Sequence, residues 1–264
     1  MPENKGGIVS PREEVLKRAS VWMRDYMKSF YNEDEEIQAA IRMKEEHTAR
    51  VHAIARELAV HLGLSAEDVL LAEIMGLLHD VGRFRQFTVY RTFVDAQSED
   101  HANLGLRVIE EEKLIDGLSS EDRECVRFAI AVHNKKEIAP TEDARCLGFA
   151  KLLRDADKLD IYYVLLPFLA PPDGAGVSPD FVVKFLAAEQ CDYTQIRTGD
   201  DRKLVRLMWA YDVNFAWTLK RIVERDYLEK IVRCLPTDAG LEPGVERLRA
   251  YVERKCREHD DIGF

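Results

Sequence analysis

Apolar residues recur at intervals of three and four along nearly the whole chain, and no other feature constrains its fold as strongly. Such intervals place side chains on one face of an α-helix, whereas a half-buried strand needs an alternation of two. The clearest stripe stops at Gly63 and consists of Val51, Ile54, Leu58 and Leu62. We find no convincing succession of strands. The sequence therefore predicts an all-α protein.

Glycine, proline and capping residues mark the ends of the expected helices. The predicted helices cover residues 33–62, 65–82, 100–113, 120–134, 141–166, 201–235 and 243–257. Ser65, Asp100 and Ser120 are the expected N-caps. Residues 83–99 lack a helical period and are predicted to form a loop or a short extended segment. The Pro- and Gly-rich residues 167–180 are the best candidate for a boundary.

The charge balance limits the partners that the chain can bind. Its 264 residues contain 38 Lys and Arg against 48 Asp and Glu, a net charge of -10. Repulsion of that sign disfavours duplex nucleic acid and anionic membranes as main partners, although a local basic pocket can still bind a small polyanion. No run of 18 apolar residues is present to span a membrane, and residues 1–12 lack the apolar core of a signal peptide.

The cysteines indicate a reducing compartment. They are widely spread, odd in number and without a C-x-x-C pair, at positions Cys125, Cys146, Cys191, Cys234 and Cys256. This usage is typical of reduced thiols in a cytosolic protein. We therefore expect a soluble, cytoplasmic protein, and a homodimer is compatible with an acidic helical chain of this size.

Four of the seven histidines fall on apolar faces of the expected helices, at positions His47, His79, His101 and His133. One histidine in such a place is usually a hydrogen-bonded core residue, but four of them in separate helical segments suggest a common purpose. Asp80 follows His79 directly. Of the other histidines, His52 and His259 are expected at the surface, and His61 lies nearer an apolar face.

The helix predicted over residues 141–166 adds a carboxylate. Asp157 lies on its inward stripe, whereas Asp155 differs from it by about 200° around the helix, so only Asp157 is expected to point into the core. An unpaired buried carboxylate is costly. Asp80, Asp157 and four imidazoles would be satisfied best around one or two divalent metal ions. This mixed donor set suits Fe, Mn, Zn, Co or Ni, and Mg is also compatible. Asp155 and Asp160 are candidates for orienting the ligands.

The tandem His79-Asp80 lies in the segment LLHDVGR and resembles the signature of the HD-domain superfamily of metal-dependent phosphohydrolases. In that family an upstream helix supplies a histidine, which corresponds to His47 in EEHT. A late helix supplies an aspartate, which corresponds to Asp157 in DADKLD. The resemblance covers about residues 40–166 and implies a helical bundle in which these residues bind metal.

His101 and His133 extend the pattern to six ligands in the order H, HD, H, H, D. This order resembles the two-metal sites of the HD-GYP cyclic dinucleotide phosphodiesterases and of the HD di-iron oxygenases, whereas the simplest HD enzymes use four ligands. The residues after His133, NKKEIAP, depart from the Gly-Tyr-Pro motif and argue against cyclic di-GMP cleavage. The segment from Gly82 to Ala102 is similar to a group of bacterial HD proteins without an assigned substrate.

The resemblance implies hydrolysis of a phosphate ester by a metal-activated water. Asp80 would bridge two ions, the first held also by His47, His79 and Asp157 and the second by His101 and His133. Arg83 and Lys158 are the cations expected to assist catalysis. Arg83, Lys135 and Lys136 are expected to bind the substrate, with Arg83 favoured because it closely follows the tandem pair. The expected partner is a small phosphorylated substrate, either a nucleotide or another phosphomonoester or phosphodiester.

Two other functions remain open. The same six ligands around two irons could activate dioxygen, as in the HD oxygenases. Alternatively, the domain could sense a nucleotide without turning it over, although an intact ligand set argues against a silent site.

Four segments are expected along the chain. Residues 1–32 would form an N-terminal helical extension, residues 33–166 the HD-type metal-binding core, residues 167–180 a connection, and residues 181–264 C-terminal helices that pack on the core. In the last segment Asp212 lies on an apolar stripe, where it either pairs with an Arg or Lys or helps to shape a pocket.

Overall fold

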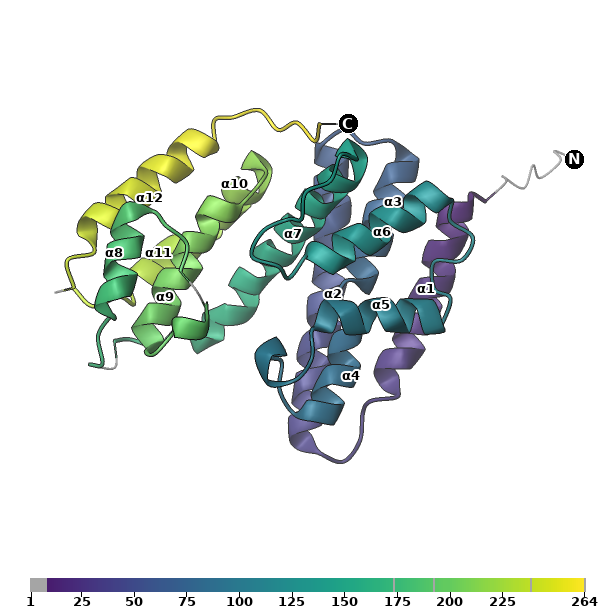
Figure 1. Ribbon diagram of the computed structural model, residues 1–264, viewed down its shortest axis with the longest axis horizontal. Coiled ribbons are helices and arrows are strands. Elements are labelled where there is room, and N and C mark those ends of the chain that lie inside the picture. Colours follow the sequence, from purple (N-terminus) through teal and green to yellow (C-terminus); the bar gives the residue numbers. More distant parts are fainter. Residues whose placement is uncertain (1–8, 173, 192, 238, 264) are drawn as a thin grey trace, which may run out of the picture. The chain divides into compact units, whose positions relative to one another are not determined.

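The computed structural model describes residues 9–263 except 173, 192 and 238, and Figure 1 shows the helices that they form. Within these residues every regular element is a helix, and β pairing is confined to an isolated bridge between Asp116 and Leu118. The predicted all-α fold is confirmed.

The chain divides into two compact units. The first comprises residues 1–157 and 262–264, and the second comprises residues 158–261. The division falls inside the long helix α7 (Ala144–Leu165). The four segments expected from the sequence stay predictions.

The first unit is built from packed helices. They are α1 (Pro11–Lys28), α2 (Glu35–His61), α3 (Ala66–Leu78), α4 (Val81–Tyr90), α5 (His101–Glu111), α6 (Ser120–Val132) and the first part of α7. Helix α2 packs on α3, α4 packs on α5, and α6 contacts both α3 and α5. The stripe recognised in the sequence faces this core, because Val51, Ile54 and Leu58 are each at most 7% exposed.

Side-chain caps set the starts of these helices. Ser65 and Asp100 each accept a hydrogen bond from the backbone N–H three residues further on, as predicted. Ser119, rather than the predicted Ser120, does the same at the start of α6. Each cap satisfies a backbone donor that the first helical turn leaves without a partner.

Residues 83–90 belong to α4, so the prediction of a loop was wrong for this stretch. The buried apolar side chains of α4 are those of Val81, Phe84 and Phe87. Three apolar positions are too few for a helical period to stand out in the sequence. The remainder of the predicted loop holds only the short 3₁₀ turn η1 (Asp95–Gln97).

The second unit contains the end of α7 and the helices α8 (Pro179–Ala187), α9 (Gly199–Met208), α10 (Ala216–Glu224), α11 (Tyr227–Val232) and α12 (Glu242–Lys255). The single helix predicted over residues 201–235 was wrong. The chain leaves the helix between α9 and α10 and again at Asp226, which has a left-handed φ of 58°. Short helices in succession can preserve an apolar stripe, so periodicity alone did not show the breaks.

The structure pairs two of the five cysteines. Cys125 in α6 and Cys146 in α7 form a disulfide, while Cys191, Cys234 and Cys256 are free. The prediction that all five are reduced thiols was therefore wrong for this pair. Folding brings together two sulfurs that are 21 residues apart in the chain, and sequence spacing gave no sign of it.

At Gly82 the helix α4 lies very close to the backbone of α5, and a substitution there tests whether this close approach is needed. A Cβ atom at Gly82 would lie 2.4 Å from the carbonyl oxygen of His101 and 2.6 Å from the backbone nitrogen of Gly105. Because both obstacles are backbone atoms, α5 would have to shift. We predict that Gly82→Ala lowers the free energy of unfolding by about 1–3 kcal/mol, as measured by urea denaturation.

Gly105→Ala is the matched control for this prediction. Its Cβ atom would first meet a methyl group of Val81, at 3.3 Å, and a side chain can adjust more easily than a backbone. The control should therefore lose clearly less stability. Equal losses would contradict the close approach at Gly82.

Candidate metal centre

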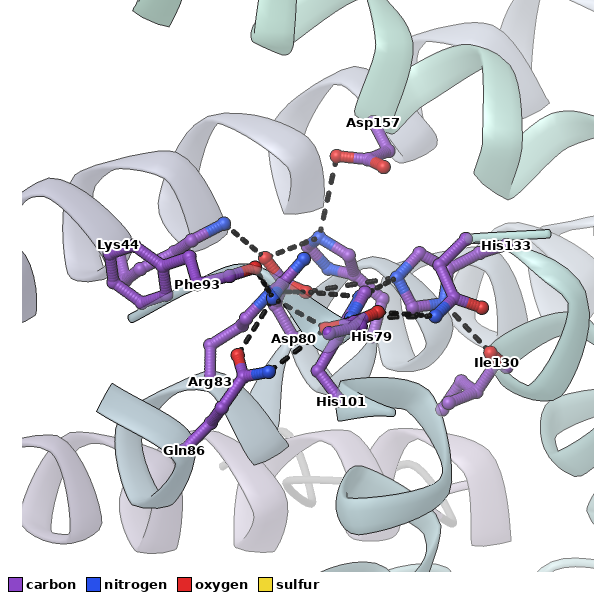
Figure 2. Close-up of polar contacts among 12 residues, drawn as sticks. Lys44, His79, Asp80, Arg83, Gln86, Phe93, His101, Ile130, His133 and Asp157 are labelled. Atoms are coloured by element: carbon purple, nitrogen blue, oxygen red, sulfur yellow. Dashed lines mark hydrogen bonds and ion pairs between the residues drawn. The ribbon is translucent and has the colours of Figure 1, made fainter. Parts of the chain in front are cut away.

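The six predicted ligands converge at one place in the first unit (Figure 2). They are His47 from α2, His79 and Asp80 from the turn between α3 and α4, His101 at the start of α5, His133 at the end of α6, and Asp157 from α7. The four imidazoles are each at most 6% exposed. Helix ends and helix faces from across the sequence thus form one buried cluster of nitrogen and oxygen donors.

The carboxylate of Asp80 lies at the middle of the cluster, and its two oxygens face different partners. Oδ2 lies 3.4 Å from Nε2 of His47 and 3.6 Å from Nε2 of His79. Oδ1 lies 3.4 Å from Nε2 of His101 and 3.7 Å from Nε2 of His133. Asp157 joins the first group, since its Oδ1 is 3.2 Å from Nε2 of His47. The donors therefore form two sets that share Asp80.

Hydrogen bonds at the far sides of His101 and His133 determine where the protons of these two rings lie. Nδ1 of His133 donates to the carbonyl of Ile130 at 2.7 Å, and Nδ1 of His101 donates to Asp95 at 2.7 Å. Carbonyl and carboxylate oxygens only accept hydrogen bonds, so both protons belong on Nδ1. With its proton on Nδ1, each ring turns the lone pair of Nε2 toward the other ring, and the two Nε2 atoms lie 3.0 Å apart. Facing lone pairs repel unless a cation lies between them.

The protonation states support this arrangement. Burial lowers the pKa of His79 and of His101 to about 4, so both rings are neutral near pH 7. Burial by itself would raise the pKa of Asp80, but Lys44 and His79 outweigh it and hold that pKa well below its usual range. The pKa of Asp157 is likewise lowered, because hydrogen bonding to His47 and the field of His79 outweigh burial.

Neutral imidazoles and ionised carboxylates are the donor set of a divalent transition metal. One ion fits among His47, His79, Asp157 and Oδ2 of Asp80, and a second fits among His101, His133 and Oδ1. The residues present therefore suit a two-metal centre bridged by a carboxylate.

A network of hydrogen bonds positions His101 from behind. Besides binding His101, Asp95 accepts hydrogen bonds from Arg83 at 3.0 Å and from the Gln86 amide at 2.9 Å. Asn134 donates to Asp95 at 3.1 Å. The carboxylate of Asp95 thus links η1 to the α4 helix and to the residue after His133. Such partners fix the orientation of a metal-binding imidazole.

The sequence analysis missed Asp95 and also Lys44, whose Nζ lies 2.6 Å from Oδ2 of Asp80. Asp95 belongs to a short 3₁₀ turn, where no period predicts the direction of a side chain. The sequence did contain a signal for Lys44. This residue precedes His47 by three residues on α2, so both side chains lie on the same face of the helix.

Of the four cations predicted to assist catalysis or bind substrate, the structure places one, Arg83, beside Asp80. Arg83 reaches the centre, with Nε 3.6 Å from Oδ1 of Asp80, while its Nη1 donates to the backbone oxygen of Phe93 at 2.7 Å. Lys135 pairs with Asp100, the cap of α5, and Lys136 is exposed. In the second unit Lys158 donates to the carbonyl oxygen of Asp212 at 2.8 Å and pairs with its carboxylate. The pairing alternative for Asp212 is therefore the one observed.

Two expectations about burial need correction. Asp155 was expected to face away from the core, yet it is fully buried. Asp160 is also buried, with 1% of its surface exposed. Helix α7 is enclosed on several faces at this point, since Leu152 and Ala156 are also completely buried. His61, expected nearer an apolar face, is exposed.

Removing Asp95 should affect one half of the centre. We predict that Asp95→Ala weakens metal binding at His101 and His133 by about 10–100-fold, because outer partners of metal ligands have effects of this size. Binding at His47 and His79 should change little. A titration with Mn²⁺ followed by calorimetry would resolve the two sites.

Glu99→Ala is the control, because Glu99 lies in the same loop and pairs through its side chain with the exposed Arg107. This variant should bind both metal ions like the parent protein. Equal weakening of both sites in Asp95→Ala would contradict the role assigned to Asp95.

Comparison with known proteins gives one family match. Residues 45–162 match the family model described as HD domain, and this range contains all six converging ligands. Neither the curated proteins nor the solved structures provide a match. The match to the HD domain and the convergence of histidines and aspartates therefore fall on the same part of the chain, residues 45–162.

Proposed function

We propose that this protein is a metal-dependent phosphohydrolase that cleaves a phosphate ester. The observation that carries the proposal is the pair of three-donor sets that share Asp80. Two divalent ions bound there would polarise the phosphate and supply a nucleophilic water near neutral pH. The HD domain supports this reaction class, because the superfamily consists mostly of metal-dependent hydrolases.

The side chains of this site have distinct roles in the proposal. Asp80 would hold both ions, because each of its oxygens faces a different pair of histidines. Asp95 keeps the proton of His101 on Nδ1 and leaves Nε2 free to bind metal. Arg83 is held beside Asp80 by its bond to the backbone of Phe93, so its cationic group can orient a phosphate. Lys158, Lys135 and Lys136 remain proposed contributors to catalysis and substrate binding.

The proposed substrate is small and phosphorylated, with nucleotides and other phosphomonoesters or phosphodiesters as candidates. The net charge of -10 disfavours duplex nucleic acid and anionic membranes as partners. Among the residues that the structure describes, no helix has the length and apolarity needed to cross a bilayer. We also propose that the protein forms a homodimer.

A cytoplasmic location is also part of the proposal. It is supported by the free thiols of Cys191, Cys234 and Cys256. In a reducing compartment the pair Cys125 and Cys146 would be opened to thiols.

An HD-type di-iron oxygenase is the second candidate. Four imidazoles and two carboxylates also form a suitable environment for two irons. The ligands do not distinguish the two reactions, so the test must measure the metal and the products together.

We predict that the purified protein binds close to two divalent ions per chain and releases phosphate from one or more members of a nucleotide and phosphoester panel. The panel would be run with Mn²⁺, Co²⁺, Mg²⁺ and Fe²⁺. The double variant His79→Ala, Asp80→Ala should lose metal and activity together, because it removes donors from both sets. Elemental analysis and a phosphate-release assay give the two readouts.

His52→Ala is the control, since His52 lies on α2 but pairs with Glu73 at 3.3 Å instead of the metal ligands. It should retain both metal and activity. Two irons with substrate-dependent oxygen uptake and no phosphate release would favour the oxygenase. Failure of the intact protein to bind metal would contradict both candidates.

A further inference from the structure

Lys44 occupies the position on Asp80 that a metal ion would also need. Its Nζ lies 2.6 Å from Oδ2 of Asp80, closer than either His47 or His79 lies to the same oxygen. The side chain of Lys44 is 14% exposed and that of Asp80 is 4% exposed, so solvent screens this contact only weakly. An ammonium group and a divalent cation at one carboxylate oxygen repel each other.

The surroundings of Lys44 keep its charge near the centre. The ring centroid of Phe93 lies 5.4 Å from Nζ of Lys44 and 5.8 Å from Cζ of Arg83. Both distances are within the range of cation–π attraction. In Figure 2 Lys44, Phe93 and Arg83 lie on one side of Asp80, and His133 lies on the other. Two cations therefore meet one aromatic ring beside the shared carboxylate.

Lys44 and Arg83 differ in how firmly they are held. Arg83 donates to Gln86, to the backbone of Phe93 and to Asp95, which ties its guanidinium to the loop. The hydrogen bond that the structure gives the Lys44 ammonium is the one to Asp80. A lysine ammonium on a flexible four-carbon stem can change partners without moving the backbone.

We propose that Lys44 is a phosphate-binding residue that rests on Asp80 in the metal-free protein. Its ammonium neutralises Asp80 when metal is absent, leaves that oxygen when the ligands are loaded, and then binds the phosphate of the substrate from the side of Phe93. The phosphate role rests on the proposed phosphohydrolase function, whereas the exchange with metal does not.

The exchange is tested by Mn²⁺ titration of metal-free protein. Lys44→Met removes the charge and keeps much of the side-chain volume. It should bind the first Mn²⁺ about tenfold more tightly, because no ammonium competes for Asp80. Lys44→Arg should stay near the parent protein. Unchanged or weaker binding by Lys44→Met would overturn the exchange.

Arg42→Met is the matched control, because Arg42 is an exposed cation on the same helix. It removes one positive charge without touching Asp80, so its Mn²⁺ affinity should be unchanged. If Arg42→Met gained as much Mn²⁺ affinity as Lys44→Met, the effect would reflect net charge alone and the proposal would fail.

Thermal unfolding adds a second readout. Metal-free Lys44→Met should melt below the parent protein, because Asp80 loses its counter-charge, and Mn²⁺ should remove that difference.

The phosphate role is tested with inorganic phosphate as the probe on Mn²⁺-loaded protein. Lys44→Met should bind phosphate about tenfold more weakly than the parent protein, and Lys44→Arg should restore most of the affinity. Unchanged phosphate affinity would overturn this role. Lack of phosphate release by the parent protein across the substrate panel would instead refute the proposed function, and it would leave the Mn²⁺ exchange standing.

Discussion

A carboxylate surrounded by four buried imidazoles is stable only if a positive charge accompanies it. Asp80 is 3% exposed, and in this protein the accompanying charges are Lys44 at Oδ2 and Arg83 near Oδ1. His79 and His101 supply no positive charge of their own near pH 7, because burial lowers the pKa of each to about 4. The centre therefore attracts cations, and divalent metal is the cation that its nitrogen donors suit.

The packing of short helices gives the donors their directions. Gly82 lets α4 approach the backbone of α5 directly after the tandem pair, which brings Asp80 and His101 together. The carbonyl of Ile130 and the carboxylate of Asp95 then hold the outer nitrogens of His133 and His101. These bonds point the inner nitrogens at one another. Hydrogen bonds outside the six donor side chains thus set the directions in which the donor atoms point.

The longer helices of the first unit, and the six side chains that converge there, could be predicted from the sequence, because long amphipathic helices leave a clear period and the histidines share that period with the core. The α4 helix was missed since its apolar face is too short to show a period. The helix predicted over residues 201–235 was too long because Asp226 allows a left-handed turn that periodicity does not reveal. Asp155 was placed on the wrong side because enclosure of α7 depends on its neighbours.

By itself, the sequence determined the all-α class, the starts of α3 and α5 and the identity of the metal-ligand candidates, since each depends on local spacing and residue type. The tertiary structure alone decided which oxygen of Asp80 faces which histidines, that Asp95 orients His101, and that Lys44 rests on Asp80. It also decided the pairing of Cys125 with Cys146. These features join residues from separate helices and loops, and their distances depend on how the elements pack.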